Sequence, residues 1–344
     1  MRLSEDDPER NWTDPGVFSV APGIHRIPLP LHADGLRAVN VYAIRAEGGL
    51  VLIDSGEAIP ESAELLPQAL DALGHGPTEV TRFLITHIHV DHYTHAVRVR
   101  REHGTPIGLG EHERPSMERI LSPHNRPLSP QISRLDRAGA QPISAELVRL
   151  TRGRGRHLRE AWEGPDEWLR DQDPIAIADR TLLPLHTPGH TAGHLVYWDQ
   201  GNALMFTGDH ILPHITPSIG FEAVESALPL GDYLTSLHRV RALPDARMLP
   251  AHGRVTAGVH DRVDALLEHH DTRLNQMAKV VLAGASTAYE VAAAVPWTRR
   301  EKALADLDLF NRMLAVNETM AHLDLLVDQR RLSARDEDGV TRYW

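Results

Sequence analysis

Short apolar runs and amphipathic stretches alternate along much of the chain. Alternating positions over 16–31 and two apolar runs over 39–56, joined at Glu47-Gly48-Gly49, predict paired strands with tight turns. Helical spacing predicts helices over 61–73 and 92–103. Further strands are expected at 81–86, 106–109, 181–186, 194–198, 203–207 and 247–250. A further helix is expected at 232–243. This order predicts an α/β fold.

Three stretches break this alternation. Residues 1–16 predict an extended, loosely held arm. Residues 111–173 carry charged helical pieces between proline breaks, which predicts a helical insertion. After residue 256 the chain is almost all helical, and it ends in a candidate two-stranded wing at 330–344. We therefore expect a catalytic domain at 17–255, with the insertion inside it, and a small helical domain at 256–344.

Composition limits the chemistry. The 344 residues include 22 histidines and no cysteine, and the formal charge is −11. Disulfides, cysteine-bound zinc, a thiolate nucleophile and iron–sulfur clusters are excluded, so nitrogen and oxygen must hold any metal. The acidic balance disfavours nucleic acid as a partner. Neither a secretory signal nor a membrane-spanning run is visible, so we expect a cytoplasmic protein without a membrane partner.

One short segment is dense in metal-binding residue types. Thr86-His87-Ile88-His89-Val90-Asp91-His92 stands where a buried strand gives way to a helix. In an extended segment, side chains two positions apart point the same way, and packing alone does not explain so many ligand types together. Three further motifs with candidate ligands each follow an expected strand and contain small residues: 187–194, 206–210 and 249–253.

With these motifs in this order, residues 17–255 resemble the metallo-β-lactamase superfamily, including its glyoxalase II-like hydrolases. The resemblance implies a four-layer αβ/βα sandwich with two metal ions at one edge. By position, it assigns the first metal to His87, His89 and His190, and the second metal to Asp91, His92 and His252, with Asp209 as the bridge. Asp54 matches the early aspartate that holds a ligand in place. The segment 93–96 is bulkier than the small pair that many members have there.

The resemblance implies a hydrolase with two divalent ions. We favour Zn²⁺, and Mn²⁺ or Fe²⁺ also suit these donors. Two cations lower the pKa of a bridging water from about 15.7 towards about 7, and the hydroxide attacks an acyl carbonyl while Asp91 orients it or takes its proton. The motifs contain no clear general acid. This favours a small-molecule thioester, lactone or activated ester as the substrate.

Other functions stay open at this point. A metal-dependent phosphodiesterase or endoribonuclease is the main alternative, and the basic cluster at 149–159 is its specific support, although a solvated loop also explains that cluster. A third hypothesis is an iron-dependent redox protein, or a non-catalytic binding protein, that uses the same scaffold.

The accessory residues and the tail allow more than one role. His194 and His210 flank the site as ligand supports, substrate contacts or packing residues, and Tyr233 is either a donor to substrate or a core residue. The tail is similar to the winged-helix appendage of some β-lactamase-like hydrolases. Its acidic residues favour packing, a homodimer contact or lining of the substrate channel over DNA binding.

Overall fold

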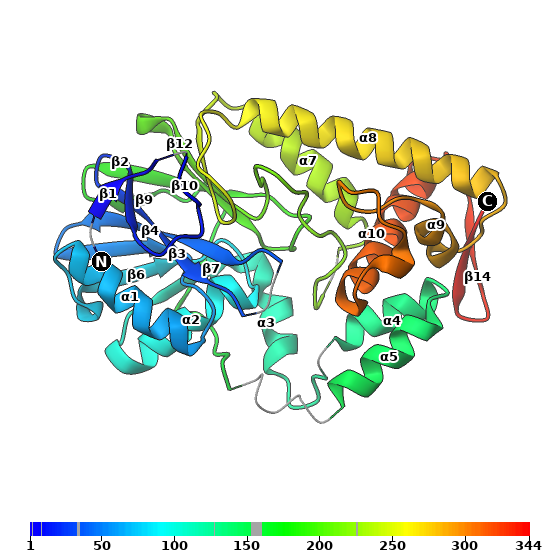
Figure 1. The fold of residues 1–344 in the computed structure, drawn as a ribbon, viewed down its shortest axis with the longest axis horizontal. Helices are drawn as coiled ribbons and strands as arrows, with labels where there is room; N and C mark the ends of the chain where they lie inside the picture. The colour runs from blue at the N-terminus through cyan, green and yellow to red at the C-terminus, as the bar shows by residue number, and fades with distance from the viewer. Residues whose placement is uncertain (2, 8, 33–34, 127, 153–159, 225) are drawn as a thin grey trace.

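Two β-sheets lie face to face in the computed structural model, which describes residues 1, 3–7, 9–32, 35–126, 128–152, 160–224 and 226–344 (Figure 1). The space between the sheets is filled by buried side chains from both, including Tyr42 and Phe206, whose rings meet edge to face at 5.3 Å. Helices cover the outer face of each sheet. This is the predicted αβ/βα sandwich.

The first sheet contains eight strands in chain order. It is antiparallel from β2 to β5 and parallel from β5 to β8. The strands are β1 (Leu3–Glu5), β2 (Val17–Ala21), β3 (Ile24–Pro30), β4 (Ala38–Ala46), β5 (Gly49–Ile53), β6 (Val80–Leu84), β7 (Ile107–Gly110) and β8 (Glu167–Leu169). The predicted turn at Glu47-Gly48-Gly49 joins β4 to β5, and both glycines there have positive φ.

The second sheet has five strands in the order β13-β12-β11-β10-β9. Its neighbours are antiparallel except for β12 and β13, which are parallel. The strands are β9 (Ile175–Ile177), β10 (Arg180–His186), β11 (Leu195–Asp199), β12 (Leu204–Gly208) and β13 (Arg247–Pro250). Most of their side chains are buried because the sheet is covered on both faces.

Two pairs of helices form the outer layers. Helices α1 (Pro60–Ala72) and α2 (Val90–His103) pack on the first sheet, where Leu66 and Val97 share a core with Phe83. Helices α7 (Pro229–Arg241) and α8 (His260–Leu282) pack on the second sheet. Apolar residues at helical spacing supply each buried face.

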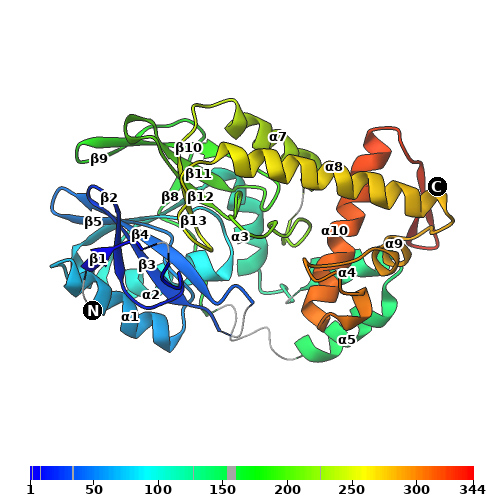
Figure 2. The ribbon, with the colours of Figure 1, turned by 45° about the horizontal axis from the view of Figure 1, so that its top comes forward.

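Helix α3 (Arg114–Leu121) lies near the middle of the molecule (Figure 2), where its Met117 joins the core of the first sheet. Other helices gather at one end of the molecule. They are α4 (Ser129–Arg137), α5 (Gln141–Thr151), α9 (Ala288–Ala294) and α10 (Leu309–Asp328), followed by the hairpin of β14 (Ala334–Glu337) and β15 (Val340–Tyr343). Figure 2 shows α4 and α5 beside α10, and Leu135 and Ile143 share one core with Val316. The insertion thus supplies part of the helical region formed by the C-terminal segment.

The structure differs from two expectations. The first residues are not a loosely held arm, because β1 pairs with β2 and Arg26 binds both Asp6 (2.6 Å) and the Trp12 carbonyl (2.8 Å). The segment 111–173 is not all helical, because β8 adds a strand to the first sheet beside β7. Three-residue strands hold their place through a neighbouring strand, and hydrophobic periodicity does not detect that.

Candidate metal centre

Four chain segments bring their motifs to one edge of the two sheets. The His87–His92 segment follows β6, the His190 turn follows β10, and Asp209 and His252 follow β12 and β13. Loops at strand ends are rigid supports for side chains because both flanking elements are fixed in the core. The seven residues predicted as ligands therefore lie together, in groups whose donor atoms are all within 4.8 Å of one another.

Three histidines form what we call the triple-histidine group: His87, His89 and His190. Nδ1 of His89 lies 3.0 Å from Nε2 of His87 and 3.0 Å from Nε2 of His190. All three nitrogens face a common point. Burial, followed by the neighbouring imidazoles, lowers the pKa of His87 well below its ordinary value, and the pKa of His89 falls to about 3. These rings are therefore neutral, as metal ligands must be.

The second set, which we call the aspartate group, consists of Asp91, His92 and His252. Oδ2 of Asp91 lies 3.3 Å from Nε2 of each histidine. Asp209 stands between the two groups, with Oδ1 3.3 Å from His252 Nε2 and Oδ2 3.6 Å from His190 Nε2. Each oxygen of this carboxylate thus faces a different group, which is the arrangement of a bridging ligand.

Hydrogen bonds on the far side of the rings fix their orientation. In three histidines Nδ1 meets an oxygen acceptor, so this nitrogen carries the proton and the Nε2 lone pair faces the cluster. The pairs are His92 with Asp54 Oδ2 (2.9 Å), His190 with the Ser218 carbonyl (2.8 Å) and His252 with the Ala38 carbonyl (2.7 Å).

The residues present fit a divalent metal. His92 Nε2, His252 Nε2 and Asp209 Oδ1 are buried and have no hydrogen-bond partner among the described residues. Leaving such atoms without a partner is costly, and a cation would satisfy all three. Although burial lowers the pKa of His252, the carboxylates of Asp209 and Asp91 raise it to about 10. A cation bound there would take the place of a proton.

Asp54 contacts both Thr86 and His92. It adopts φ +59° directly after β5, and this conformation turns its carboxylate towards the start of the metal-binding segment. One oxygen accepts from the Thr86 backbone N–H (2.8 Å) and the other from His92 Nδ1. A single buried side chain therefore fixes both the backbone before His87 and the ring of His92.

His194 supports Asp209 and does not face the cluster. Its Nε2 accepts from the Asp209 backbone N–H (3.1 Å), so Nδ1 carries the proton and donates to Thr187 Oγ1 (3.0 Å). A Cβ at Gly208, where φ is +51°, would lie 2.6 Å from His194 Nε2. Glycine is therefore required there for this approach.

Tyr233 and His210 lie behind the cluster. The fully buried Tyr233 donates its hydroxyl to the His210 carbonyl (3.0 Å), and its ring meets the rings of His210 and His270. The structure thus places Tyr233 in the core rather than on a substrate surface. His210 is fully buried, and neither ring nitrogen has a partner among the described residues.

Sequence reasoning missed two buried acids beside the centre. Glu113 follows β7 in a single turn, and Glu222 lies in the segment between β12 and α7. Both accept hydrogen bonds from the turn that carries His190. The available signal for Glu113 is its place in the turn Glu111-His112-Glu113 directly after a buried strand, but nothing in the sequence shows which donors it meets.

Two other features lie apart from the cluster. Residues 153–159 of the predicted basic cluster fall outside the described residues; the earlier part belongs to the end of α5.

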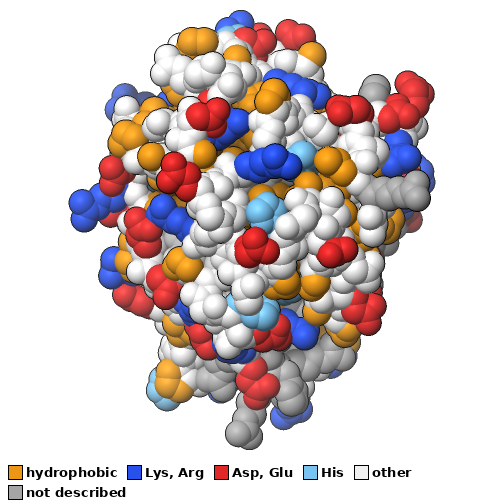
Figure 3. Space-filling model, turned by 90° about the vertical axis from the view of Figure 1, so that its left-hand side faces the viewer, with side chains coloured by type: hydrophobic (Ala, Val, Ile, Leu, Met, Phe, Trp, Pro, Cys, Tyr) orange, Lys and Arg blue, Asp and Glu red, His pale blue; other side chains and the backbone are white. Residues whose placement is uncertain are grey.

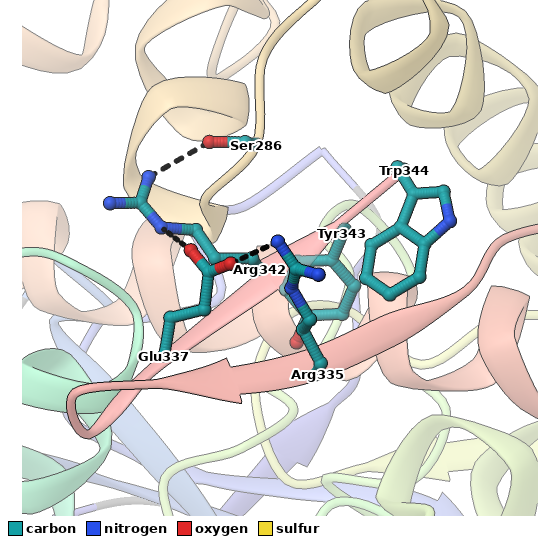
Figure 4. Close-up of a pocket in the computed structure, with 6 residues that line it drawn as sticks. All are labelled: Ser286, Arg335, Glu337, Arg342, Tyr343 and Trp344. Atoms are coloured by element: carbon teal, nitrogen blue, oxygen red, sulfur yellow. Dashed lines mark hydrogen bonds and ion pairs between the residues drawn. The ribbon is translucent and has the colours of Figure 1, made fainter.

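A pocket of about 430 Å³ lies at the C-terminal hairpin (Figure 4). Its Arg335 and Arg342 both pair with Glu337, and Arg342 also donates to Ser286. These internal ion pairs reduce the attraction of the pocket for an anionic ligand.

The family model described as the metallo-beta-lactamase superfamily matches residues 34–252, which include every predicted metal ligand. This chain belongs to the metallo-β-lactamase superfamily. Together with the His/Asp groups, membership identifies it as an enzyme of the metal-dependent hydrolase type. Every described helix is too short or too polar to span a membrane.

Relatives extend the likeness over most of the chain. A relative from Bacillus subtilis, "Probable metallo-hydrolase YqjP", is 24% identical and aligns over 93% of both chains. The "Atrochrysone carboxyl ACP thioesterase" of Aspergillus fumigatus is 24% identical over 72% of this chain and 45% of its own length. A "Beta-lactamase domain protein" from Burkholderia ambifaria has a solved structure with a TM-score of 0.82 and 26% identity, covering 98% of this chain and 97% of its own.

Proposed function

We propose that this protein hydrolyses the acyl bond of a small-molecule thioester, or the related bond of a lactone or ester, with two divalent ions. The observation that carries the proposal is the pair of buried donor groups that share Asp209. We favour Zn²⁺ for this imidazole-rich donor set, and Mn²⁺ or Fe²⁺ also suit it. When bound, the ions supply Lewis acidity, which polarises a carbonyl and lowers the pKa of water to about 7.

Asp91 is the residue that we assign to proton transfer. Its side chain is 14% exposed, whereas that of Asp209 is 7% exposed and that of His92 is fully buried. Burial alone would raise the pKa of Asp91, but His92 and His252 hold it well below the ordinary value. An ionised carboxylate at the rim of the cluster orients the attacking water and accepts its proton.

An aromatic wall beside the triple-histidine group suits an apolar acyl chain. The Phe221 ring lies 5.6 Å from the ring of His89 and 5.5 Å from the ring of Phe310, which is 44% exposed. Val90, between His89 and Asp91, is 43% exposed. Apolar side chains kept open to solvent next to a catalytic centre provide binding energy for an apolar group.

The leaving group also favours a thioester. A thiolate departs without a proton, whereas an alkoxide or an amine needs a general acid. Tyr233 cannot serve as that acid in this structure, because its buried hydroxyl is bonded to the His210 carbonyl. The thioesterase named among the relatives gives this choice further support.

A substrate panel tests the proposal. The metal-loaded enzyme is assayed on acyl-coenzyme A thioesters, lactones, aryl esters, an aryl phosphodiester and single-stranded RNA. We expect thioesters to turn over fastest, and Asp209→Asn to lower kcat/KM by at least about 100-fold because the bridge is lost. Asp173→Asn, at an exposed surface aspartate, is the matched control. Cleavage of RNA or phosphodiester without acyl hydrolysis would instead establish the phosphodiesterase alternative.

A second experiment tests the aromatic wall. Phe310→Ala should raise KM for an octanoyl thioester by roughly 10-fold and leave acetyl thioester kinetics within about twofold, because only the long chain reaches this ring. Phe310→Leu keeps the apolar volume and should restore most of the octanoyl affinity. An equal effect on both chain lengths would place the acyl group elsewhere.

A further inference from the structure

A buried glutamate connects the two turns that carry the triple-histidine group. One oxygen of the fully buried Glu113 accepts from the Ile88 backbone N–H (3.3 Å), between His87 and His89. The same oxygen accepts from the Thr191 hydroxyl (2.5 Å), next to His190. This one carboxylate therefore binds both the residue between His87 and His89 and the residue that follows His190.

The close approach of Glu113 depends on the local sequence of the His190 turn. A Cβ at Gly193 would lie 2.3 Å from the Glu113 backbone nitrogen and 2.5 Å from its Cγ, so a larger residue would push the glutamate away. From the other side, Glu222 accepts from the Ala192 backbone N–H (2.5 Å). Glu113 and Glu222 thus contact the same short turn, residues 191–193.

The aspartate group does not share these contacts. His92 is held by Asp54, and His252 is held by the Ala38 carbonyl. Within the described part of the chain, the hydrogen bonds of Glu113 are made beside the three histidines of the triple-histidine group and not to the side chains of the aspartate group. The cost of burying its carboxyl is considerable, since burial raises the pKa of Glu113 to about 7. A buried acid with two specific donors, one backbone N–H and one hydroxyl, is hard to explain by packing alone.

We propose that Glu113 is a positioning residue for the triple-histidine metal site, because it fixes the separation between the His87–His89 segment and the His190 turn. Ligand supports of this kind change metal affinity by roughly 10–100-fold when they are removed. Glu222 holds only the His190 turn, so its contribution is the smaller of the two. This inference concerns metal binding and holds whether or not the substrate is an acyl compound.

Cobalt titration in two backgrounds tests the proposal. In His252→Ala the triple-histidine group is complete, and in His89→Ala the aspartate group is complete. Adding Glu113→Ala should weaken Co²⁺ binding by roughly 10–100-fold and alter the visible spectrum in the first background. In the second background the affinity should change by less than about threefold. Glu113→Gln retains an acceptor oxygen and should restore both affinity and spectrum in the first background.

Two results would overturn the assignment. One is an unchanged Co²⁺ affinity and spectrum in the His252→Ala background, and the other is equal weakening in both backgrounds. Circular dichroism shows whether Glu113→Ala folds. If it does not, Thr191→Val replaces it in the test, because this substitution removes the hydroxyl that donates to Glu113 and keeps a similar side-chain volume. Thr191→Val should weaken Co²⁺ binding to the triple-histidine group several-fold, and wild-type affinity would refute the proposal.

Discussion

Two clusters of buried imidazoles in this molecule have different surroundings. At the metal centre, nitrogen lone pairs converge with two carboxylates on one point. Between α8 and α10, the fully buried His270 and His322 contact each other, with Nδ1 of His270 3.2 Å from Nε2 of His322. The Nδ1–H of His322 donates to the Glu318 carbonyl (2.8 Å), so the pair forms a short chain inside the protein.

This comparison separates burial from function. The pKa of His322 is lowered to about 4 mainly by burial, and that of His89 is lowered to about 3 for the same main reason. A depressed histidine pKa therefore does not identify a metal ligand in this protein. What distinguishes the centre is that imidazole nitrogens and carboxylate oxygens from distant segments lie within 4.8 Å of one another.

Metal removal should give the largest difference between the two regions. When the free metal concentration is about 1,000 times Kd, each bound ion adds roughly 4 kcal/mol to the stability of the folded state. For a chain of 344 residues this corresponds to a Tm increase of roughly 6 °C. Treatment with a chelator should lower Tm by at least that amount in calorimetry, with metal content checked by mass spectrometry. The variant His270→Leu/His322→Leu should keep the same metal-dependent shift. A Tm that does not move after verified removal would contradict the predicted link.

Loss of Asp54 should produce the next largest effect. Asp54→Ala removes the acceptor that orients His92 and leaves the Thr86 N–H without its partner, so we expect metal affinity at the aspartate group to fall roughly 10–100-fold. Competition with a chromophoric chelator measures this change. Asp54→Asn keeps one acceptor oxygen and should lie between the wild type and Asp54→Ala. If both variants bind metal as tightly as the wild type, Asp54 serves only to stabilise the turn after β5.

Acid should destabilise the protein by a smaller amount, through the buried pair of His270 and His322. Burial lowers the pKa of His322, with Arg273 and His269 acting in the same direction, so the unfolded chain binds an extra proton between about pH 6.5 and pH 4. The free energy of unfolding therefore falls as the pH drops through this window, by roughly 1–2 kcal/mol between pH 7 and pH 5. In urea titrations, His270→Leu/His322→Leu should show a correspondingly flatter pH dependence. An identical slope would show that other groups dominate.

One face of the molecule (Figure 3) shows how charged side chains are distributed there. Acidic and basic side chains are interspersed on the face shown in Figure 3, the side of the molecule that carries the N-terminal strands. A nucleic-acid surface requires a concentrated basic patch. Although the chain carries a formal charge of −11, this face shows neither sign as a continuous area.

The sequence predicts the strand-end motifs well because each depends on local order. The segment His87–His92, the glycine-flanked turns and the hairpin at Glu47-Gly48-Gly49 need only neighbouring residues for their interpretation. The family match and the stacked sheets confirm the predicted fold. The ligand assignments themselves rest on position in the motifs and on the convergence seen in the structure.

Long-range contacts could not be predicted. Glu113 and Glu222 act on backbone N–H groups far away in the sequence, and the Ser218 carbonyl that receives His190 has no side-chain signature. Strand β8 lies in a stretch dominated by charged helical pieces and depends on its pairing with β7. Such features follow from tertiary packing and not from local periodicity.

Helix α8 has a practical consequence for anyone who wants the catalytic domain alone. Its 23 residues extend about 35 Å, from α7 beside the second sheet to α9 and α10 (Figure 1). A chain cut at residue 255 would expose Leu237 and Val240 on α7 and remove the partner of α4 and α5. We expect such a fragment to aggregate during expression, so the apparent domain boundary in the sequence is a poor place to shorten the gene.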